Sequence, residues 1–525
     1  MSHFIRPARS AAFAAAALLT AAALAGCGSG DEKDGAEKGE NPAGSATASP
    51  SAVALPAALT GQQLAWAACP APSVAQGGGE APGAGWECAA MKAPLDYGKP
   101  AGETIDLALI RKKATDRGKR IGSLVYNFGG PGASGVKTLP QLAAKDYKKL
   151  NSAYDLVSFD PRGVGDSAGV SCVDDKTMDE LNASDNTTES WKRFADGCRK
   201  NSAKILPHVG TANAARDLDL MRQVLGDQKL NYFGISYGTE LGGVYAHLFP
   251  KNVGRTVFDA VVDPTQDTVQ QRLGQLKGFQ LALEHAMRFC VKEYAANCPT
   301  GPDAASGVKR INAMLDQLEK KPAATDSGRK LTAGQARSGM IATLYSEESW
   351  DHLVQGIGEV QLNGTGNLLL AYADSMNGRD EKGRYDSSTG AQGAISCADD
   401  NTRITAEQAA ALLPEFRKAS PVFGDLTAED LTTGCQDWPV QGERAKPEVS
   451  APGAAPIVVI GNTGDPATPV EGARRMADAL GKGVGIGLTV KGEGHGTYGV
   501  NSCATKTVDE FLIDGKVPAD GATCS

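Results

Sequence analysis

The chain has 525 residues, a formal net charge of −8 at pH 7 and eleven cysteines, with 41% hydrophobic and 22% charged residues. These ordinary fractions exclude a wholly disordered chain and a polytopic membrane protein, and the lack of a long basic run argues against nucleic acid as a partner. The odd cysteine count is high for a reduced compartment, so it predicts export and a separate purpose for one cysteine.

Residues 1–26 are predicted to be a lipoprotein signal peptide. Two arginines in the first ten residues precede an apolar stretch, 11–24, that is too short to span a bilayer comfortably. The sequence Leu-Ala-Gly-Cys at 24–27 resembles the lipobox of bacterial lipoproteins, in which the cysteine, here Cys27, is lipidated after cleavage. An ordinary secretory signal that contains a cysteine is the alternative. The lipobox hypothesis predicts a membrane lipoprotein that faces outward and contacts the membrane through this anchor alone, or that is released to the medium. With Cys27 lipidated, ten cysteines remain for other roles.

Residues 27–60 are rich in Gly, Ser, Ala, Pro and charged residues, which predicts a flexible tether. From residue 61 onward, short and nearly continuous apolar runs alternate with amphipathic stretches, as expected for a parallel sheet buried on both faces. One amphipathic stretch ends near Leu225, and Asn213 is its predicted N-cap. The alternation predicts an α/β fold. The predicted strands are 104–110, 123–128, 155–159, 230–235, 255–262, 457–460 and 486–490.

The strand pattern lapses between residues 264 and 455. This part, 264–455, is predicted to be largely helical and to form a cap, because it leaves the sheet after one strand and returns before the next. The flanking segments 61–263 and 456–525 then form one core. The cap is inserted between the strands predicted at 255–262 and 457–460, which are numbered as the sixth and seventh strands of the core.

The G-x-S-x-G pattern occurs twice, around Ser167 and around Ser236, so context has to choose the nucleophile. The first copy looks like the serine loop of chymotrypsin-like proteases, whose histidine base precedes the serine, but the only histidine before Ser167 is His3 in the signal peptide. We therefore interpret Ser167 as part of a turn. Ser236 lies between a predicted strand and a predicted helix, 239–249, where a tight turn exposes the hydroxyl. Ser236 is the predicted nucleophile.

A serine nucleophile needs a base, and in the α/β-hydrolase order of Ser, Asp or Glu, and His the base follows the serine. Of the four histidines after Ser236, only His495 lies in a glycine-rich loop directly after the last predicted strand. His495 is therefore the predicted base. Asp465, in the loop after the preceding strand, is the predicted acid that orients the imidazole, with Asp259 and Asp263 as competitors.

The oxyanion hole of such an enzyme needs two backbone amides. One belongs to the residue after the nucleophile, Tyr237, and the other to a loop after an early strand. That loop is Asn-Phe-Gly-Gly-Pro-Gly at 127–132, whose glycines let main-chain amides face a substrate. Gly130 is the predicted second donor.

Two segments of the first half resemble prolyl iminopeptidases. The sequence FGGPG at 128–132 is similar to their HGGPG loop, and DPRGVGDS at 160–167 is similar to their D-x-R-G-x-G-x-S segment. The elbow GISYGT at 234–239 occurs with GDPATP at 464–469 and GHG at 494–496. This combination resembles the secreted tripeptidyl aminopeptidases of Streptomyces type.

The resemblance covers about 61–525 and implies an α/β-hydrolase fold with a catalytic triad of Ser236, Asp465 and His495. It also implies an exopeptidase whose partners are peptide substrates with a free N-terminus, from which it removes short peptides. No cofactor or metal is predicted, because no cluster of His, Cys and Asp ligands suggests zinc.

The resemblance further implies carboxylates in the cap that bind the α-ammonium of the substrate, since a buried cation needs a paired anion. For each candidate the alternative is a solvated surface acid. Glu240 is excluded from this set because it follows the elbow on its helix. The candidates are Glu347, Glu348, Asp399 and Asp400.

The ten remaining cysteines are predicted to form five local disulfides, since neighbours along the sequence close loops of modest length within one region. The predicted pairs are Cys69–Cys88, Cys172–Cys198, Cys290–Cys298, Cys397–Cys435 and Cys503–Cys524.

These observations favour a serine exopeptidase that releases di- or tripeptides, with tripeptides implied by the resemblance. An esterase or other acyl hydrolase on the same scaffold is the alternative, because only the substrate separates the two activities. A non-enzymatic lipoprotein with a relic site is a third hypothesis, and the intact triad and oxyanion loop argue against it. The sequence leaves the oligomeric state open.

Overall fold

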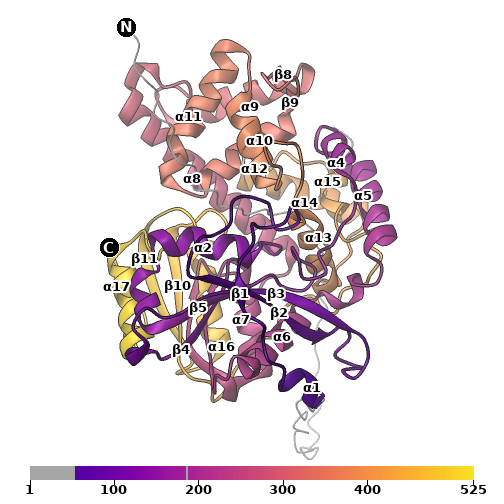
Figure 1. The fold of residues 1–525 in the computed structure, drawn as a ribbon. Coiled ribbons are helices and arrows are strands. Elements are labelled where there is room, and N and C mark those ends of the chain that lie inside the picture. Colours follow the sequence, from indigo (N-terminus) through magenta and orange to yellow (C-terminus); the bar gives the residue numbers. More distant parts are fainter. Residues whose placement is uncertain (1–53, 185–186) are drawn as a thin grey trace, which may run out of the picture.

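A ten-stranded sheet crosses the body of the molecule, and helices cover both of its faces (Figure 1). The structure is a computed structural model that describes residues 54–184 and 187–525. The strand order in the sheet is β1-β2-β3-β5-β4-β6-β7-β10-β11-β12. The bounds are β1 Ala67–Ala68, β2 Trp86–Pro94, β3 Thr104–Lys112, β4 Gly122–Asn127, β5 Tyr154–Phe159, β6 Leu230–Ile235, β7 Val253–Asp259, β10 Ile457–Gly464, β11 Gly485–Glu493 and β12 Ala522–Cys524.

The sheet is parallel over most of its width. The edge strands β1, β2 and β3 pair antiparallel with one another, and β3 pairs antiparallel with β5. Every further pair, from β5 with β4 to β11 with β12, is parallel. The predicted α/β class with a mostly parallel sheet is therefore confirmed.

The central strands are buried on both faces, which explains their nearly continuous apolar runs. In β10, Ile457 and Val459 belong to one buried apolar cluster, whereas Val458 and Ile460 belong to another. Because successive side chains of a strand point to opposite faces, the two clusters lie on opposite sides of the sheet. The helices that contribute to the first cluster include α6 Thr211–Val224, α7 Tyr237–Leu248 and α16 Val470–Leu480. Those of the second include α2 Gly135–Lys145, α3 Lys148–Ala153 and α17 Ser502–Asp509.

Most of the remaining helices lie between β7 and β10 along the chain. These two strands are hydrogen-bonded neighbours, with Ile457 opposite Thr256, so the intervening segment leaves and re-enters the sheet at adjacent strands. Part of this segment forms an apolar cluster of its own, and Figure 1 shows α8 to α12 as a layer above the sheet. The helices are α8 Thr268–Tyr294, α9 Ala304–Lys320, α10 Ala333–Leu344, α11 Trp350–Gly358, α12 Asn367–Met376, α13 Ser388–Asp399, α14 Ala406–Ala419 and α15 Ala428–Thr432. A two-stranded sheet, β8 Ala323–Ala324 and β9 Lys330–Leu331, completes the segment.

Two further helices, α4 Asp175–Asn182 and α5 Thr187–Ser202, follow β5. In the structure each cysteine between residues 69 and 524 is in a disulfide, five in all. The pairs are Cys69–Cys88, Cys172–Cys198, Cys290–Cys298, Cys397–Cys435 and Cys503–Cys524.

The predicted signal peptide and Cys27 lie outside the described residues. The predicted tether extends too far, because α1, Ala57–Thr60, is helical and Leu59 is buried in the apolar cluster shared by α6 and α7. Within 54–184 and 187–525, no helix combines the length and the apolar character that a membrane span needs.

Several element boundaries differ from those predicted. The strand predicted over 255–262 ends at Asp259, because Ala260 adopts a positive φ of 56° that a strand does not accommodate. Helix α6 begins at Thr211, so Asn213 lies inside its first turn and does not cap it. The edge strands β1, β2 and β12 were not predicted, since edge strands lack the long apolar runs of the central ones.

Candidate active site

Ser236 stands alone between the end of β6 at Ile235 and the start of α7 at Tyr237. Its backbone has φ 57° and ψ −127°, a region that residues other than glycine rarely occupy. Such strain persists only where the surrounding structure enforces it, and it is common at functional sites. The turn directs a serine to the end of the sheet and to the N-terminus of a helix, as a nucleophile elbow does.

The flanking glycines are required by close packing. A Cβ atom on Gly234 would lie 2.4 Å from the carbonyl oxygen of Gly238. A Cβ on Gly238 would lie 2.5 Å from the carbonyl oxygen of Asn127, at the end of β4. Since real Cβ atoms do not approach this closely, the elbow needs glycine at both positions.

The G-x-S-x-G copy around Ser167 has a different environment. Ser167 is fully buried in the loop that follows β5, and its hydroxyl oxygen accepts a hydrogen bond from the Ala108 amide at 2.8 Å. Its carbonyl oxygen accepts a bond from the Gly163 amide within the same turn. This placement agrees with the interpretation of Ser167 as a structural turn residue.

His495 and Asp465 come together at the ends of two adjacent parallel strands, β11 and β10. The Nδ1 atom of His495 lies 2.9 Å from Oδ1 and 3.0 Å from Oδ2 of Asp465, and both side chains are at most 8% exposed. Because a carboxylate accepts hydrogen bonds, Nδ1 donates to it, and Nε2 then carries the free lone pair. Nε2 is buried without a hydrogen-bond partner, so within the described part of the chain no bond joins it to the Ser236 hydroxyl.

The carboxylate of Asp465 is fixed by its own loop. The amides of Ala467 and Thr468 both donate to Oδ1 at 2.9 Å, and the Thr468 hydroxyl donates to Oδ2 at 2.9 Å. These bonds orient the carboxylate towards the imidazole of His495, which is the task of the third member of a triad.

The two competing acids have other partners. Asp259 is buried and accepts bonds from the amides of Thr497 and Tyr498, at 2.8 and 2.9 Å, so it holds the loop that follows His495. Asp263 pairs with Arg475 and accepts bonds from Thr265. Of the three acids, only Asp465 is bonded to the His495 ring.

The other histidines after Ser236 also have partners elsewhere. Nδ1 of His247 contacts the Ser450 carbonyl oxygen, His285 contacts Glu493, and His352 contacts Tyr372. None of these contacts involves the elbow.

The glycine-rich loop packs directly against the elbow. A Cβ on Gly129 would lie 2.8 Å from Cβ of Ser236 and 3.1 Å from the amide nitrogen of Tyr237, and Gly129 has a φ of 84°. The amide of Gly129 is already bonded to Oδ1 of Asn127. Gly130 and Tyr237 line the same cavity as Ser236, and the structure records no bond from either of their amides within the described residues. These two amides are therefore free to donate to an oxyanion.

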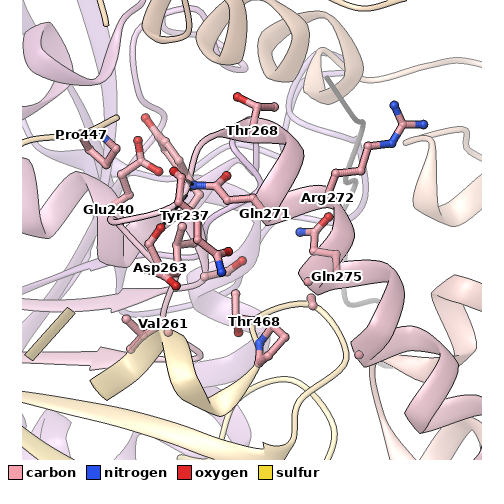
Figure 2. A pocket seen from close by; sticks show the side chains of 18 of the residues that line it. Tyr237, Glu240, Val261, Asp263, Thr268, Gln271, Arg272, Gln275, Pro447 and Thr468 are labelled. Carbon is pink, nitrogen blue, oxygen red and sulfur yellow. Dashed lines mark hydrogen bonds between the residues drawn. The ribbon is translucent and has the colours of Figure 1, made fainter. Parts of the chain in front are cut away.

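A cavity of about 590 Å³ opens beside the nucleophile. Its lining includes Ser236 and Tyr237 from the elbow, and Asp465 and Thr468 from the β10 loop. Figure 2 shows Thr268, at the start of α8, on the side of the cavity opposite Thr468. The cavity thus lies between the end of the sheet and a helix of the inserted segment.

The four acids predicted to bind an amine separate into two groups. Asp399 and Asp400 line the cavity, whereas Glu347 and Glu348 are exposed on a short 3₁₀ helix and are absent from the lining. Asp400 accepts a bond from the Thr268 hydroxyl at 2.8 Å, which places it on the α8 side. The Asp399 oxygens accept bonds from the amide and hydroxyl of Thr211.

Glu240, which was not expected among the amine-binding acids, also lines this cavity. It lies four residues after Ser236, and on a helix residues at this spacing share a face. This four-residue spacing from Ser236 is the feature of the sequence that could have identified Glu240 as a cavity residue. Burial, with a contribution from nearby Asp399, raises the pKa of Glu240 to about 8, although Arg444 acts in the opposite direction. Burial likewise raises the pKa of Asp399 to about 6, against the bonds from Thr211.

The pKa of His495 is raised above the ordinary value of 6.5. Burial alone would lower it, but the charge of Asp465 and the hydrogen bond to that carboxylate favour the protonated ring, and Asp259 adds to the effect. The site therefore stabilises the imidazolium that forms when a histidine takes the proton of a serine.

We expect kcat/KM to rise with pH and to reach half its plateau above pH 6.5, because a general base must be neutral and the raised pKa keeps His495 protonated longer. The measurement is a pH profile of kcat/KM with a substrate that has no ionisable group between about pH 5 and pH 9. A midpoint at or below pH 6.5 would contradict the assignment of the acidic limb to His495.

Two family descriptions match the chain. One, "alpha/beta hydrolase fold", matches residues 123–292, and the other, "TAP-like protein", matches residues 420–524. Among curated relatives, serine protease Hip1 of Mycobacterium tuberculosis is 37% identical over 491 residues, covering 88% of this chain and 91% of the relative. Carboxylesterase B of the same organism is 32% identical and covers 83% of this chain and 86% of its own length. Tripeptidyl aminopeptidase of Streptomyces lividans is 32% identical and covers 84% of this chain and 83% of its own length.

Proposed function

Because the chain belongs to the α/β-hydrolase family of serine peptidases that contains Hip1 and the tripeptidyl aminopeptidases, we propose that it is an exopeptidase. It releases short peptides, and most specifically tripeptides, from free N-termini through an acyl-enzyme on Ser236. The observation that carries this proposal is the strained serine elbow beside a cavity whose wall also holds Asp465, itself bonded to His495.

In this mechanism the Ser236 hydroxyl oxygen attacks the carbonyl carbon of the scissile bond while Nε2 of His495 removes its proton. The amides of Gly130 and Tyr237 donate to the oxyanion that develops on the carbonyl oxygen. His495 then gives the proton to the leaving amine, and a water molecule hydrolyses the acyl-enzyme by the same steps. Asp465 keeps the proton of the ring on Nδ1, so that Nε2 can act as the base.

The inserted helices, 264–455, act in this proposal as a cap that closes the substrate cavity. Among its acids, Asp400 is the best candidate for the α-ammonium of the substrate. It lines the cavity on the α8 side, away from Thr468, where the free end of a peptide acylated on Ser236 would lie. Both oxygens of Asp399 accept bonds from Thr211, and those of Asp400 accept bonds from Thr268 and Thr402, so it is the position on the α8 side that favours Asp400. The exposure of Glu347 and Glu348 argues against them.

We expect acetylation of the substrate amine to lower kcat/KM by roughly 30-fold or more, because it removes the cation that the partly buried carboxylate of Asp400 would pair with. The test compares tri-alanyl p-nitroanilide with its N-acetylated form. Asp400→Asn should slow only the free-amine substrate, whereas Glu348→Gln, an exposed acid outside the cavity, serves as the matched control. Equal rates on the free and blocked substrates would refute the exopeptidase proposal.

An esterase or other acyl hydrolase is the second candidate, and the relative named carboxylesterase B favours it. The same comparison separates the two, since a carboxylesterase has no need for a substrate amine. A chain that hydrolyses p-nitrophenyl esters but neither tri-alanyl substrate belongs to this second class.

We also propose that the protein is exported from the cytosol. The five disulfides support an oxidising compartment. Anchoring through Cys27 concerns residues outside the described part of the chain, and labelling with a radioactive or alkyne fatty acid in wild-type and Cys27→Ala chains tests it.

A further inference from the structure

Glu240 is an acidic side chain that lines the cavity and that the proposed mechanism does not use. Within the described residues its carboxylate accepts no hydrogen bond and forms no ion pair, although the cavity wall partly buries it. Figure 2 shows it on the side of the cavity near Pro447. A partly buried carboxylate is less well hydrated than an exposed one, so a group that supplies positive charge would stabilise its ionised form.

The charged neighbours of Glu240 leave an excess of negative charge. Asp399, on α13, and Arg444, in the loop that follows α15, are the two charged groups that act on it. The main-chain amide of Arg444 donates to the Asp399 carbonyl oxygen. The Nη2 atom of Arg444 is buried and has no hydrogen-bond partner in the described residues. When both carboxylates are ionised, these two acids and one guanidinium have a net charge of −1. One further cation would therefore neutralise them.

The position of Glu240 indicates which part of a substrate this cation belongs to. Four residues of α-helix correspond to a rise of about 6 Å, so Glu240 lies roughly one turn from Ser236. The four-carbon stem of a lysine carries its charge over roughly this distance from the backbone. The α-ammonium of an extended tripeptidyl group would lie about 10 Å from the attacked carbonyl, beyond this position.

Building on the proposed peptidase activity, we propose that Glu240, supported by Asp399, selects a basic side chain on the residue that is acylated on Ser236. The substrate class is therefore a peptide cleaved after lysine or arginine. Glu240 is a specificity-determining residue, and the separate Asp400 remains the candidate for the α-ammonium.

The test compares Ala-Ala-Lys-p-nitroanilide with Ala-Ala-norleucine-p-nitroanilide, whose side chain has the same stem without the charge. Wild-type protein is expected to prefer lysine by roughly 30-fold in kcat/KM, and Glu240→Gln to reduce this preference to about one. Glu471→Gln is the matched control, because Glu471 is an exposed acid at the rim of the same cavity and should leave the preference intact.

A pH series distinguishes recognition of charge from a merely structural role. Since burial raises the pKa of Glu240 to about 8, the free protein must lose a proton from this group to bind a cation. The preference for lysine over norleucine should therefore increase between about pH 6 and pH 9 in the wild type, and be constant with pH in Glu240→Gln. A thermal unfolding curve checks that the variant is folded.

Each result decides the proposal. A wild-type preference near one, with both peptides hydrolysed, overturns the role of Glu240 while the proposed function stands. A variant that loses rate equally on both peptides, and only when their amine is free, assigns Glu240 to the α-ammonium and also overturns it. Hydrolysis of neither peptide by the wild type refutes the proposed function and this inference with it.

Discussion

Ser236→Ala is expected to lower kcat by about 10⁶-fold, because the proposed acyl-enzyme cannot form without the serine oxygen. Binding should be nearly unchanged, since the variant retains the cavity and the amides of Gly130 and Tyr237. A residual rate above that of the uncatalysed reaction is expected from those amides. Single-turnover kinetics with a p-nitroanilide substrate measures the loss.

Ser167→Ala is the matched control, since it removes the serine of the other G-x-S-x-G copy. Its hydroxyl accepts one hydrogen bond from Ala108, so we expect a loss of about 1 kcal/mol in the free energy of unfolding without a loss of kcat. Labelling with a fluorophosphonate, followed by peptide mapping, should modify Ser236. Retained turnover by Ser236→Ala would mean that the nucleophile lies elsewhere.

Asp465→Asn is expected to lower kcat by about 10⁴-fold with little change in KM. The asparagine side chain can donate an N–H to Nδ1 of His495, which favours the ring tautomer whose proton is on Nε2. That tautomer cannot accept the proton of Ser236. The effect should therefore appear in the chemical step, which burst or single-turnover kinetics isolates.

Asp263→Asn provides the comparison for this variant. Asp263 lines the same cavity but pairs with Arg475 and has no bond to the His495 ring, so a change of less than about tenfold is expected. If Asp263→Asn caused the larger loss, the acid of the triad would have been misassigned.

Much of the sheet could be predicted because its central strands carry local evidence of their environment. Strands such as β4 and β10 are buried on both faces, so each contains an unbroken apolar run, 124–126 and 457–460, and this pattern is visible without knowing the neighbours. The edge strands β1, β2 and β12 are only partly buried, and their residues follow no comparable rule. The end of β7 could not be predicted, because Ala260 has a positive φ that alanine does not favour.

The candidate triad could be predicted for a related reason. In an α/β sheet the loops that follow parallel strands meet at one edge, so the order of strands along the chain constrains which loops lie near Ser236. The scarcity of histidine then reduced the choice of base to His495. Asp465 was preferred to Asp259 and Asp263 for its position after the penultimate strand, whereas the bonds that distinguish the three acids are visible only in the structure.

The amine-binding acids were harder to predict, since exposure is decided by packing. The pair Glu347 and Glu348 and the pair Asp399 and Asp400 look alike as sequence, yet only the second pair lines the cavity. Glu240 was rejected on its position along the chain, although a helix places every fourth residue on the same face.

By itself, the sequence determined the class of fold, the strained serine turn and the residues that can form a triad, because these depend on local apolar runs, on glycine and on chain order. The tertiary structure decided which residues of distant segments form hydrogen bonds with one another and line the same cavity. The amide at the start of α6 is bonded by Asp399, 188 residues away, and the same carboxylate lies beside Glu240 in the cavity. Such partners depend on the folding of the inserted helices over the sheet, and burial in that fold raises the pKa of both acids, which no local sequence pattern records.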